Sequence, residues 1–179
     1  MDVFELVTHP DFPSRVVTSI TASTQQSAGT IFLQYSVVGR LDLVRWPAPA
    51  IPLRTDGLWK HTCFEIFIGH PQAGYTEYNF SPSGEWASYF FDWYRDGMRA
   101  ATWLPEPVVH ASRNGLFKLG TEIDLTEHLK DGASHLALSA VIEELDGTKS
   151  YWALAHAPGP PDFHNSDCFI ATLPAPNAP

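Results

Sequence analysis

The sequence predicts an all-β fold, a β-sandwich or jelly roll of roughly ten or more antiparallel strands. The first observation is a series of short runs in which apolar and polar residues alternate, as in strands with one buried face. The second is the presence of turn signals, such as Asn114-Gly115 and Asp146-Gly147, between these runs. The third is that helical periodicity is nowhere sustained. Together these patterns favour antiparallel strands joined by tight turns.

The predicted strands are β-branched and aromatic runs that lie between the turn signals. After a short mixed run at 3–8, they cover residues 15–23, 29–38, 62–68, 75–80, 85–92, 108–111, 116–123, 135–143, 150–156 and 168–173. Asp124 is a good helix N-cap and predicts one short helical turn after it. Three prolines exclude a continuous helix from 39–55, which we expect to be a long loop. Trp46 in this loop either covers a site or anchors the loop.

The central stretch, residues 56–95, is the part of the sequence that points to function. Alternation in 62–68 places Phe64 and Ile66 on one face of a strand and Glu65 on the other. If the extended chain reaches back to Trp59, this tryptophan shares the face of Glu65.

The segment 81–84 contains proline and glycine and predicts a hairpin loop. A four-residue loop would pair Asn79 with Trp86 and Glu77 with Ser88. One face of the hairpin would then carry Glu, Asn, Ser and Trp side chains together.

Such a mixed face suits a polar, ring-shaped ligand. An indole can stack on the apolar side of a sugar ring while carboxylates and amides bond its hydroxyl groups. The simpler alternative is that Trp59, Trp86 and Trp93 cap the hydrophobic core, because half-buried aromatic residues are common in β domains.

The bulk properties limit the classes of protein to consider. A chain of 179 residues and 19.9 kDa is long enough for one well-buried core but too short for two domains that each bury a core of their own. We therefore expect one domain over residues 1–173 and a loose tail at 174–179. The net charge of −9, with no basic run, argues against nucleic acid as a partner. No segment is long and apolar enough to span a membrane.

The N-terminus lacks the basic and apolar regions of a signal peptide, so the expected location is the cytoplasm. The cysteines, Cys63 and Cys168, do not form a CxxC pattern. Neither a disulfide framework nor a zinc site is therefore expected.

Three blocks of the sequence together resemble a known family. They are GLWKHTCFEIFIG, EYNFSPSGEWASYFFDWYR and SYWALAHAPGPPDFHNSDCF. These blocks are similar to DOMON-like proteins, relatives of the family 9 carbohydrate-binding modules, in the bacterial branch found as single small domains. The resemblance implies a β-sandwich with a ligand site on one side. The wider group binds sugars or haem, so the resemblance alone does not fix the function.

The resemblance also implies candidate site residues. In the sugar-binding relatives a tryptophan precedes a strand glutamate by six positions and both contact the sugar, a spacing that Trp59 and Glu65 reproduce. Asn79 and Arg95 match the asparagine and arginine that hold hydroxyl groups there. A second tryptophan completes an aromatic clamp in the relatives, whereas this chain has Phe163 and His164 in the corresponding region.

We therefore expect a module that binds a small-molecule ligand, with a carbohydrate as the favoured class and no cofactor or metal. The predicted ligand-binding residues are Trp59, Glu65, Asn79, Trp86, Arg95, His156 and His164. A structural alternative for Arg95 is a buried ion pair with Glu65, Glu77 or Asp92. The oligomeric state is not predicted.

Other functions stay open at this point. A haem carrier could use Met98 with His156 or His164 as axial ligands. A metal-dependent enzyme could use His156, Asp162 and His164 of the C-terminal loop.

Two catalytic arrangements are also possible. Glu65 and Glu77 could be the carboxylate pair of a glycoside hydrolase. Cys63 could be a nucleophile beside His61, although a cysteine in a strand is more often a small buried hydrophobic residue.

Overall fold

A computed structural model confirms the all-β class. It describes residues 1–70, 74–101, 108–113, 115–129, 132 and 134–174. The strands are β1 (Asp2–Thr8), β2 (Val17–Ser27), β3 (Thr30–Gly39), β4 (Cys63–Gly69), β5 (Tyr75–Phe80), β6 (Trp86–Phe91), β7 (Arg99–Ala100), β8 (Val108–Arg113), β9 (Leu116–Asp124), β10 (Ser134–Glu143), β11 (Lys149–Ala153) and β12 (Ala171–Leu173). The short helical turns are η1 (Leu41–Leu43), η2 (Leu58–Lys60), α1 (Thr126–Leu129) and η3 (Ser166–Cys168).

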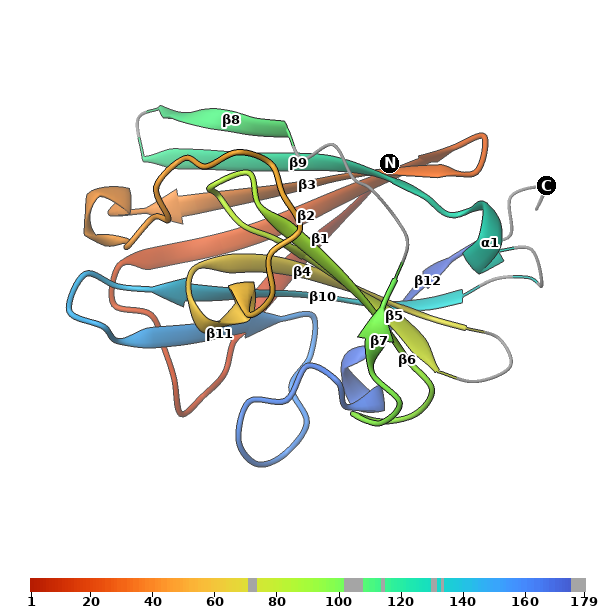
Figure 1. The fold of residues 1–179 in the computed structure, drawn as a ribbon. Helices are drawn as coiled ribbons and strands as arrows, with labels where there is room; N and C mark the ends of the chain where they lie inside the picture. Colours follow the sequence, from red (N-terminus) through yellow and green to blue (C-terminus); the bar gives the residue numbers. More distant parts are fainter. Residues whose placement is uncertain (71–73, 102–107, 114, 130–131, 133, 175–179) are drawn as a thin grey trace.

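The strands pair antiparallel in the order β7-β6-β5-β4-β10-β11-β1-β2-β3-β9-β8, and β12 pairs with the start of β10. β1 takes part in two different pairings. Its residues 2–6 pair with β2, whereas Val7 and Thr8 pair with β11. The sheet therefore folds into two layers at β1. In Figure 1, β2, β3, β9 and β8 form one layer, called here the upper layer, and β4, β10 and β11 of the lower layer run beneath it.

The main hydrophobic core lies between the two layers. Ile20 and Leu33 of the upper layer and Ile66 and Leu138 of the lower layer are buried in one continuous cluster. The hydroxyl of Tyr35 crosses the interface and donates to the backbone oxygen of Glu65 at 2.5 Å. These contacts define a β-sandwich, whose inner faces carry the alternating apolar residues.

A second hydrophobic cluster covers part of the outer face of the lower layer. Phe67 and Tyr75 belong to it, together with Phe163 and Cys168 from the C-terminal loop. Phe64 and Ile66 belong to the inner core, so the alternation predicted for β4 is confirmed. The lower layer therefore has apolar residues on both faces, with the C-terminal loop packed against its outer face.

The predicted register of the β5–β6 hairpin is wrong by one residue. Ser81 and Glu85 are bonded across the turn, from the Ser81 N–H to the Glu85 oxygen at 2.9 Å, so the loop has three residues, not four. Gly84 permits this loop because it adopts a left-handed conformation with φ of 95°. Asn79 consequently lies opposite Ala87, and Phe80 lies opposite Trp86. A shift of one residue exchanges the two faces of β6.

The long loop before β4 is anchored by Trp46. Its indole N–H donates to the Leu41 oxygen at 2.8 Å, and its ring stacks on Phe117 at a centroid distance of 4.3 Å. This geometry supports the anchoring alternative. Cys63 and Cys168 are both buried free thiols. In the described part of the chain, no helix has the length and apolar character needed to cross a membrane.

Candidate functional site

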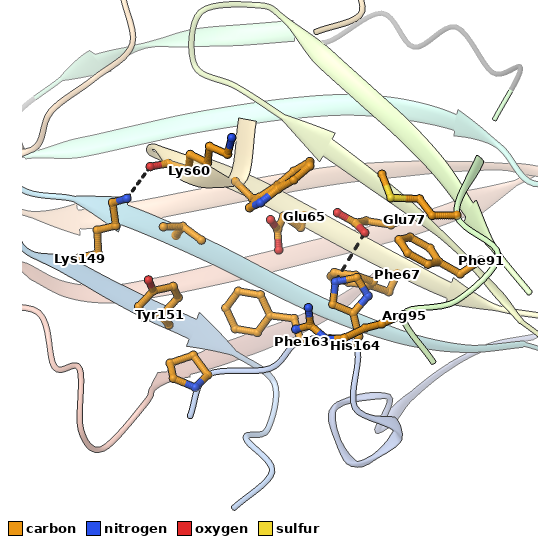
Figure 2. A pocket seen from close by; sticks show the side chains of 14 residues that line it. Lys60, Glu65, Phe67, Glu77, Phe91, Arg95, Lys149, Tyr151, Phe163 and His164 are labelled. Atoms are coloured by element: carbon orange, nitrogen blue, oxygen red, sulfur yellow. Dashed lines mark hydrogen bonds and ion pairs between the residues drawn. The ribbon is translucent and has the colours of Figure 1, made fainter. Parts of the chain in front are cut away.

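A cavity of about 450 Å³ opens on the outer face of the lower layer (Figure 2). Its size is within the usual range for small-molecule sites. The strands supply its floor, while η2, the β6–β7 loop and the C-terminal loop supply its rim. The lining residues are Trp59, Lys60, Glu65, Phe67, Glu77, Phe91, Arg95, Met98, Val141, Lys149, Tyr151, Pro161, Phe163 and His164. We call this cavity the outer pocket.

Aromatic side chains form much of the wall of the outer pocket. Trp59 extends from η2 and packs edge-on against Tyr89 at a centroid distance of 5.8 Å. It remains 37% exposed, so part of the indole is free to contact a ligand. Phe163 and Tyr151 approach each other at 6.2 Å from the C-terminal loop and β11. The wall therefore offers apolar ring surface from separate elements.

The polar floor consists of two buried carboxylates. Glu65 and Glu77 are 2% and 5% exposed, respectively. Glu65 pairs with Asn79 across β4 and β5, and Phe67 pairs with Glu77, so the two glutamates are diagonal neighbours on one face. Glu65 accepts a hydrogen bond from Ser139 at 2.8 Å, and Glu77 accepts one from Asn79 at 2.6 Å. Figure 2 shows both side chains on these neighbouring strands.

Burial changes the proton affinity of this pair. Desolvation, reinforced by the charge of Glu77, raises the pKa of Glu65 to about 8. Desolvation also raises the pKa of Glu77 to about 7, against the opposing effects of the Asn79 hydrogen bond and the Arg95 charge. The floor therefore retains a proton near neutral pH, and it can both donate and accept hydrogen bonds.

His164 lies at one end of the floor. Its Nδ1 is 2.7 Å from the Tyr75 hydroxyl, and its Nε2 is 3.8 Å from the Glu77 carboxylate. Burial, with the nearby charge of Arg95, lowers the pKa of His164 to about 4. The ring is thus neutral at physiological pH and does not balance the charge of Glu77.

Arg95 joins the β6–β7 loop to the C-terminal loop. Its Nε and Nη2 donate to Oδ1 of Asp162 at 3.2 and 2.7 Å. The Tyr94 hydroxyl donates to the other oxygen of Asp162 at 2.5 Å. The structural alternative predicted for Arg95 named the wrong acidic partner, because the C-terminal loop returns Asp162 to this point.

The structure brings together four of the predicted site residues: Trp59, Glu65, Arg95 and His164 all line the outer pocket. Asn79 is fully buried beneath the pocket, where it supports Glu77.

Trp86 does not reach the outer pocket. It is buried in the main core on the opposite face of the sheet, because the hairpin register differs from the predicted one. His156 also lies outside the pocket lining: its Nε2 is 2.9 Å from the Val7 oxygen, and its ring packs edge-on against His9. The prediction that these two side chains share a site with Glu65 is therefore corrected.

The other predicted chemical groupings are placed as follows. No cluster of three or more His, Cys, Asp or Glu side chains suited to a metal ion occurs among the described residues, and His156 and Asp162 have separate partners. Burial raises the pKa of the Cys63 thiol well above its ordinary value. His61 is bonded to Glu143 at 2.7 Å. Met98 and His164 do line the same cavity.

Sequence reasoning missed Lys60, Lys149 and Tyr151 as lining residues. Alternation along β11 places Lys149 and Tyr151 on one face and could have indicated this pair. Nothing in the sequence indicated which strand faces would lie beside β4, because β10 enters between β4 and β11 from a distant part of the chain.

The fold and the pocket define an all-β sandwich with a small-molecule cavity on an outer sheet face, and solved structures share this architecture. No family model and no curated protein matches the sequence. A candidate carbohydrate-binding protein from Bacteroides uniformis superimposes with a TM-score of 0.70 and 16% identity, over 97% of this chain and 86% of that one.

Two structures of a family 9 carbohydrate-binding module from Caldicellulosiruptor kristjanssonii also match. The glucose complex gives a TM-score of 0.55 and 7% identity, over 90% of this chain and 78% of that one. The cellotriose complex gives a TM-score of 0.53 and 8% identity, over 89% of this chain and 78% of that one. At these identities the comparisons establish a shared fold.

Proposed function

We propose that this chain is a carbohydrate-binding module whose ligand occupies the outer pocket. The observation that carries the proposal is the combination of aromatic walls and two buried carboxylates in one cavity. Sugar rings present apolar C–H faces to aromatic groups and hydroxyl groups to hydrogen-bonding partners. The shared fold with carbohydrate-binding modules supports the same conclusion.

In this proposal each group has a distinct role. Trp59 packs against one face of a sugar ring, and Phe163 limits the cavity from the C-terminal loop. Glu65 and Glu77 bond hydroxyl groups as acceptor and, in the protonated form, as donor. Arg95 positions the rim through Asp162 and Asn79 orients Glu77, so both act without being required to touch the sugar.

The direct test is calorimetric titration with a panel of mono- and oligosaccharides that includes glucose, glucosamine and cellotriose. We expect saturable binding by at least one sugar, abolished in Trp59→Ala because the stacking surface is lost. Trp93→Ala is the matched control, since Trp93 is 65% exposed and does not line the pocket. Absence of binding across the panel, or equal loss in both variants, would contradict the proposal.

Haem binding is the second candidate function, favoured by the presence of Met98 and His164 in the same cavity. Both ring nitrogens of His164 already face other groups, so ligation would require one of these contacts to break. A Soret shift on adding haemin, lost in Met98→Ala, would support haem binding. An unchanged haemin spectrum would exclude it.

A further inference from the structure

The floor of the outer pocket contains more acidic than basic groups. In the described part of the chain, no lysine or arginine forms an ion pair with Glu65 or Glu77. Arg95, whose charge acts on Glu77, is already paired with Asp162. His164 faces Glu77 at 3.8 Å but remains neutral. The two buried carboxylates therefore lack a full positive partner.

The lysines of the pocket do not fill this role. Lys149 donates from Nζ to the backbone oxygen of Lys60 at 2.6 Å, and Lys60 itself is exposed at the rim. Figure 2 shows both lysines at the end of the pocket away from Glu77 and His164. Near neutral pH the two glutamates retain a proton between them, and the remaining negative charge has no lysine or arginine of its own. A positive charge on the occupant of the pocket would complement it.

Aromatic rings surround the same space. Phe67 lies directly opposite Glu77 and two residues after Glu65 on β4, and Phe91 and Trp59 also line the cavity. The faces of aromatic rings attract cations, most strongly where water is excluded. Carboxylates beneath and aromatic rings beside a cavity form a favourable environment for an ammonium group that is attached to a larger ring.

We propose that the outer pocket selects sugars that carry a free amino group, with the ammonium ion placed against Glu65 and Glu77. This inference rests on the proposed carbohydrate-binding function and defines its ligand class. The ammonium donates hydrogen bonds to the carboxylate oxygens that Ser139 and Asn79 leave available. The sugar ring packs against Trp59 as any other hexose would.

The experiment compares three ligands that share one ring: glucosamine, glucose and N-acetylglucosamine. Titrations use the whole chain of 179 residues near neutral pH. We expect glucosamine to bind on the order of tenfold more tightly than glucose, because a charge-assisted hydrogen bond replaces a neutral one. N-acetylglucosamine lacks the positive charge and is expected to lose this advantage.

Variants locate the effect in the floor. Glu65→Gln and Glu77→Gln retain side-chain length and an oxygen acceptor for Ser139 or Asn79. We expect each variant to reduce the preference for glucosamine over glucose to about twofold or less, whatever its effect on the affinity for glucose itself. Glu5→Gln is the control, since Glu5 is an exposed residue of β1 outside the pocket, and its preference should match the parent protein.

The outcomes separate the two proposals. Equal affinity for glucosamine and glucose would overturn the amino-sugar inference and leave carbohydrate binding standing. Equal affinity for glucosamine and N-acetylglucosamine would also overturn it, because charge would then play no part. Failure of all three sugars and of the wider panel would overturn the carbohydrate-binding function itself.

Discussion

At the scale of single residues, the distinctive feature is the placement of two glutamates in a nearly dry sheet face. Their neighbours supply one hydrogen bond to each, from Ser139 and Asn79, and no compensating lysine or arginine among the described residues. An ionised carboxylate in such a place is costly unless it is paired. We therefore expect the two glutamates to lower the free energy of unfolding of the ligand-free protein, although they also form the polar part of the binding surface.

The pH dependence of stability tests this balance. The folded-state pKa of Glu65, about 8, lies above its ordinary value of 4.5, so the folded protein holds the proton more tightly than the unfolded chain. The favourable contribution is complete below about pH 4.5 and is lost as the pH rises toward 8. Melting temperatures across this window should fall less steeply for Glu65→Gln than for the parent protein. A Glu5→Gln control should follow the parent.

If the melting temperatures of Glu65→Gln and the parent fell equally steeply with pH, the raised pKa of Glu65 would be contradicted. The Glu77→Gln variant provides an independent check, because the pKa of Glu77 is raised to about 7 by the same burial. The melting temperature of Glu77→Gln should also fall less steeply with pH than that of the parent, over a window that ends near pH 7 and not near pH 8. A profile for Glu77→Gln that is steeper than that of the parent would reverse the sign of the argument.

At the scale of elements, the entry into β5 positions Tyr75, which bonds His164 at the pocket. Gly74 precedes Tyr75 with φ of 79°, and a Cβ atom there would lie 2.2 Å from the backbone oxygen of Phe91. Gly74→Ala therefore combines left-handed strain with a backbone clash. We expect a loss in the free energy of unfolding well above the ~1–2 kcal/mol of left-handed strain alone.

Gly147 provides a matched control for this prediction. It has a similar φ of 88°, and a Cβ atom there would meet nothing within 4 Å. Gly147→Ala should therefore show the strain alone, about 1–2 kcal/mol in urea unfolding. Equal losses in the two variants would mean that the close approach to Phe91 is unimportant.

The elements also explain which parts of the site could be predicted. Alternation in β4 correctly places Glu65 on the face opposite Phe64, because the period of two needs only local sequence. The predicted register of the β5–β6 hairpin is wrong because loops of three and of four residues both suit the segment 81–84. A shift of one residue in the register exchanges the two faces of the strand. Trp86 was misplaced for this reason.

Contacts between segments that are distant in the chain could not be predicted from the sequence. The Arg95–Asp162 pair joins residues 67 positions apart, and only the return of the C-terminal loop brings them together. His156 was grouped with His164 because both lie near each other in the chain, yet the end of β11 directs His156 toward β1. Spatial proximity in a loop does not follow from sequence proximity.

At the scale of the whole molecule, one continuous core joins both layers of the sandwich. The organisation as a single domain stays a prediction, and thermal unfolding tests it. We expect one cooperative transition, because neither layer can keep its inner face dry without the other. Two separate transitions would contradict a single domain.

The same measurement reports binding. A sugar at a hundred times its dissociation constant should add ~2.7 kcal/mol to the free energy of unfolding, which corresponds to roughly 5–10 °C in melting temperature for a chain of this size. Trp59→Ala should lose this shift and Trp93→Ala should retain it.

The double pairing of β1 has a consequence for handling the protein. Because β1 pairs with β2 through residues 2–6 and with β11 through Val7 and Thr8, it covers part of the hydrogen-bonding edge of each neighbour. Removing or displacing this one strand would leave two unpaired edges on the same molecule. Open edges of this kind recruit strands from other copies. We therefore expect a variant that lacks residues 2–8 to associate edge to edge with other copies more readily than the parent protein.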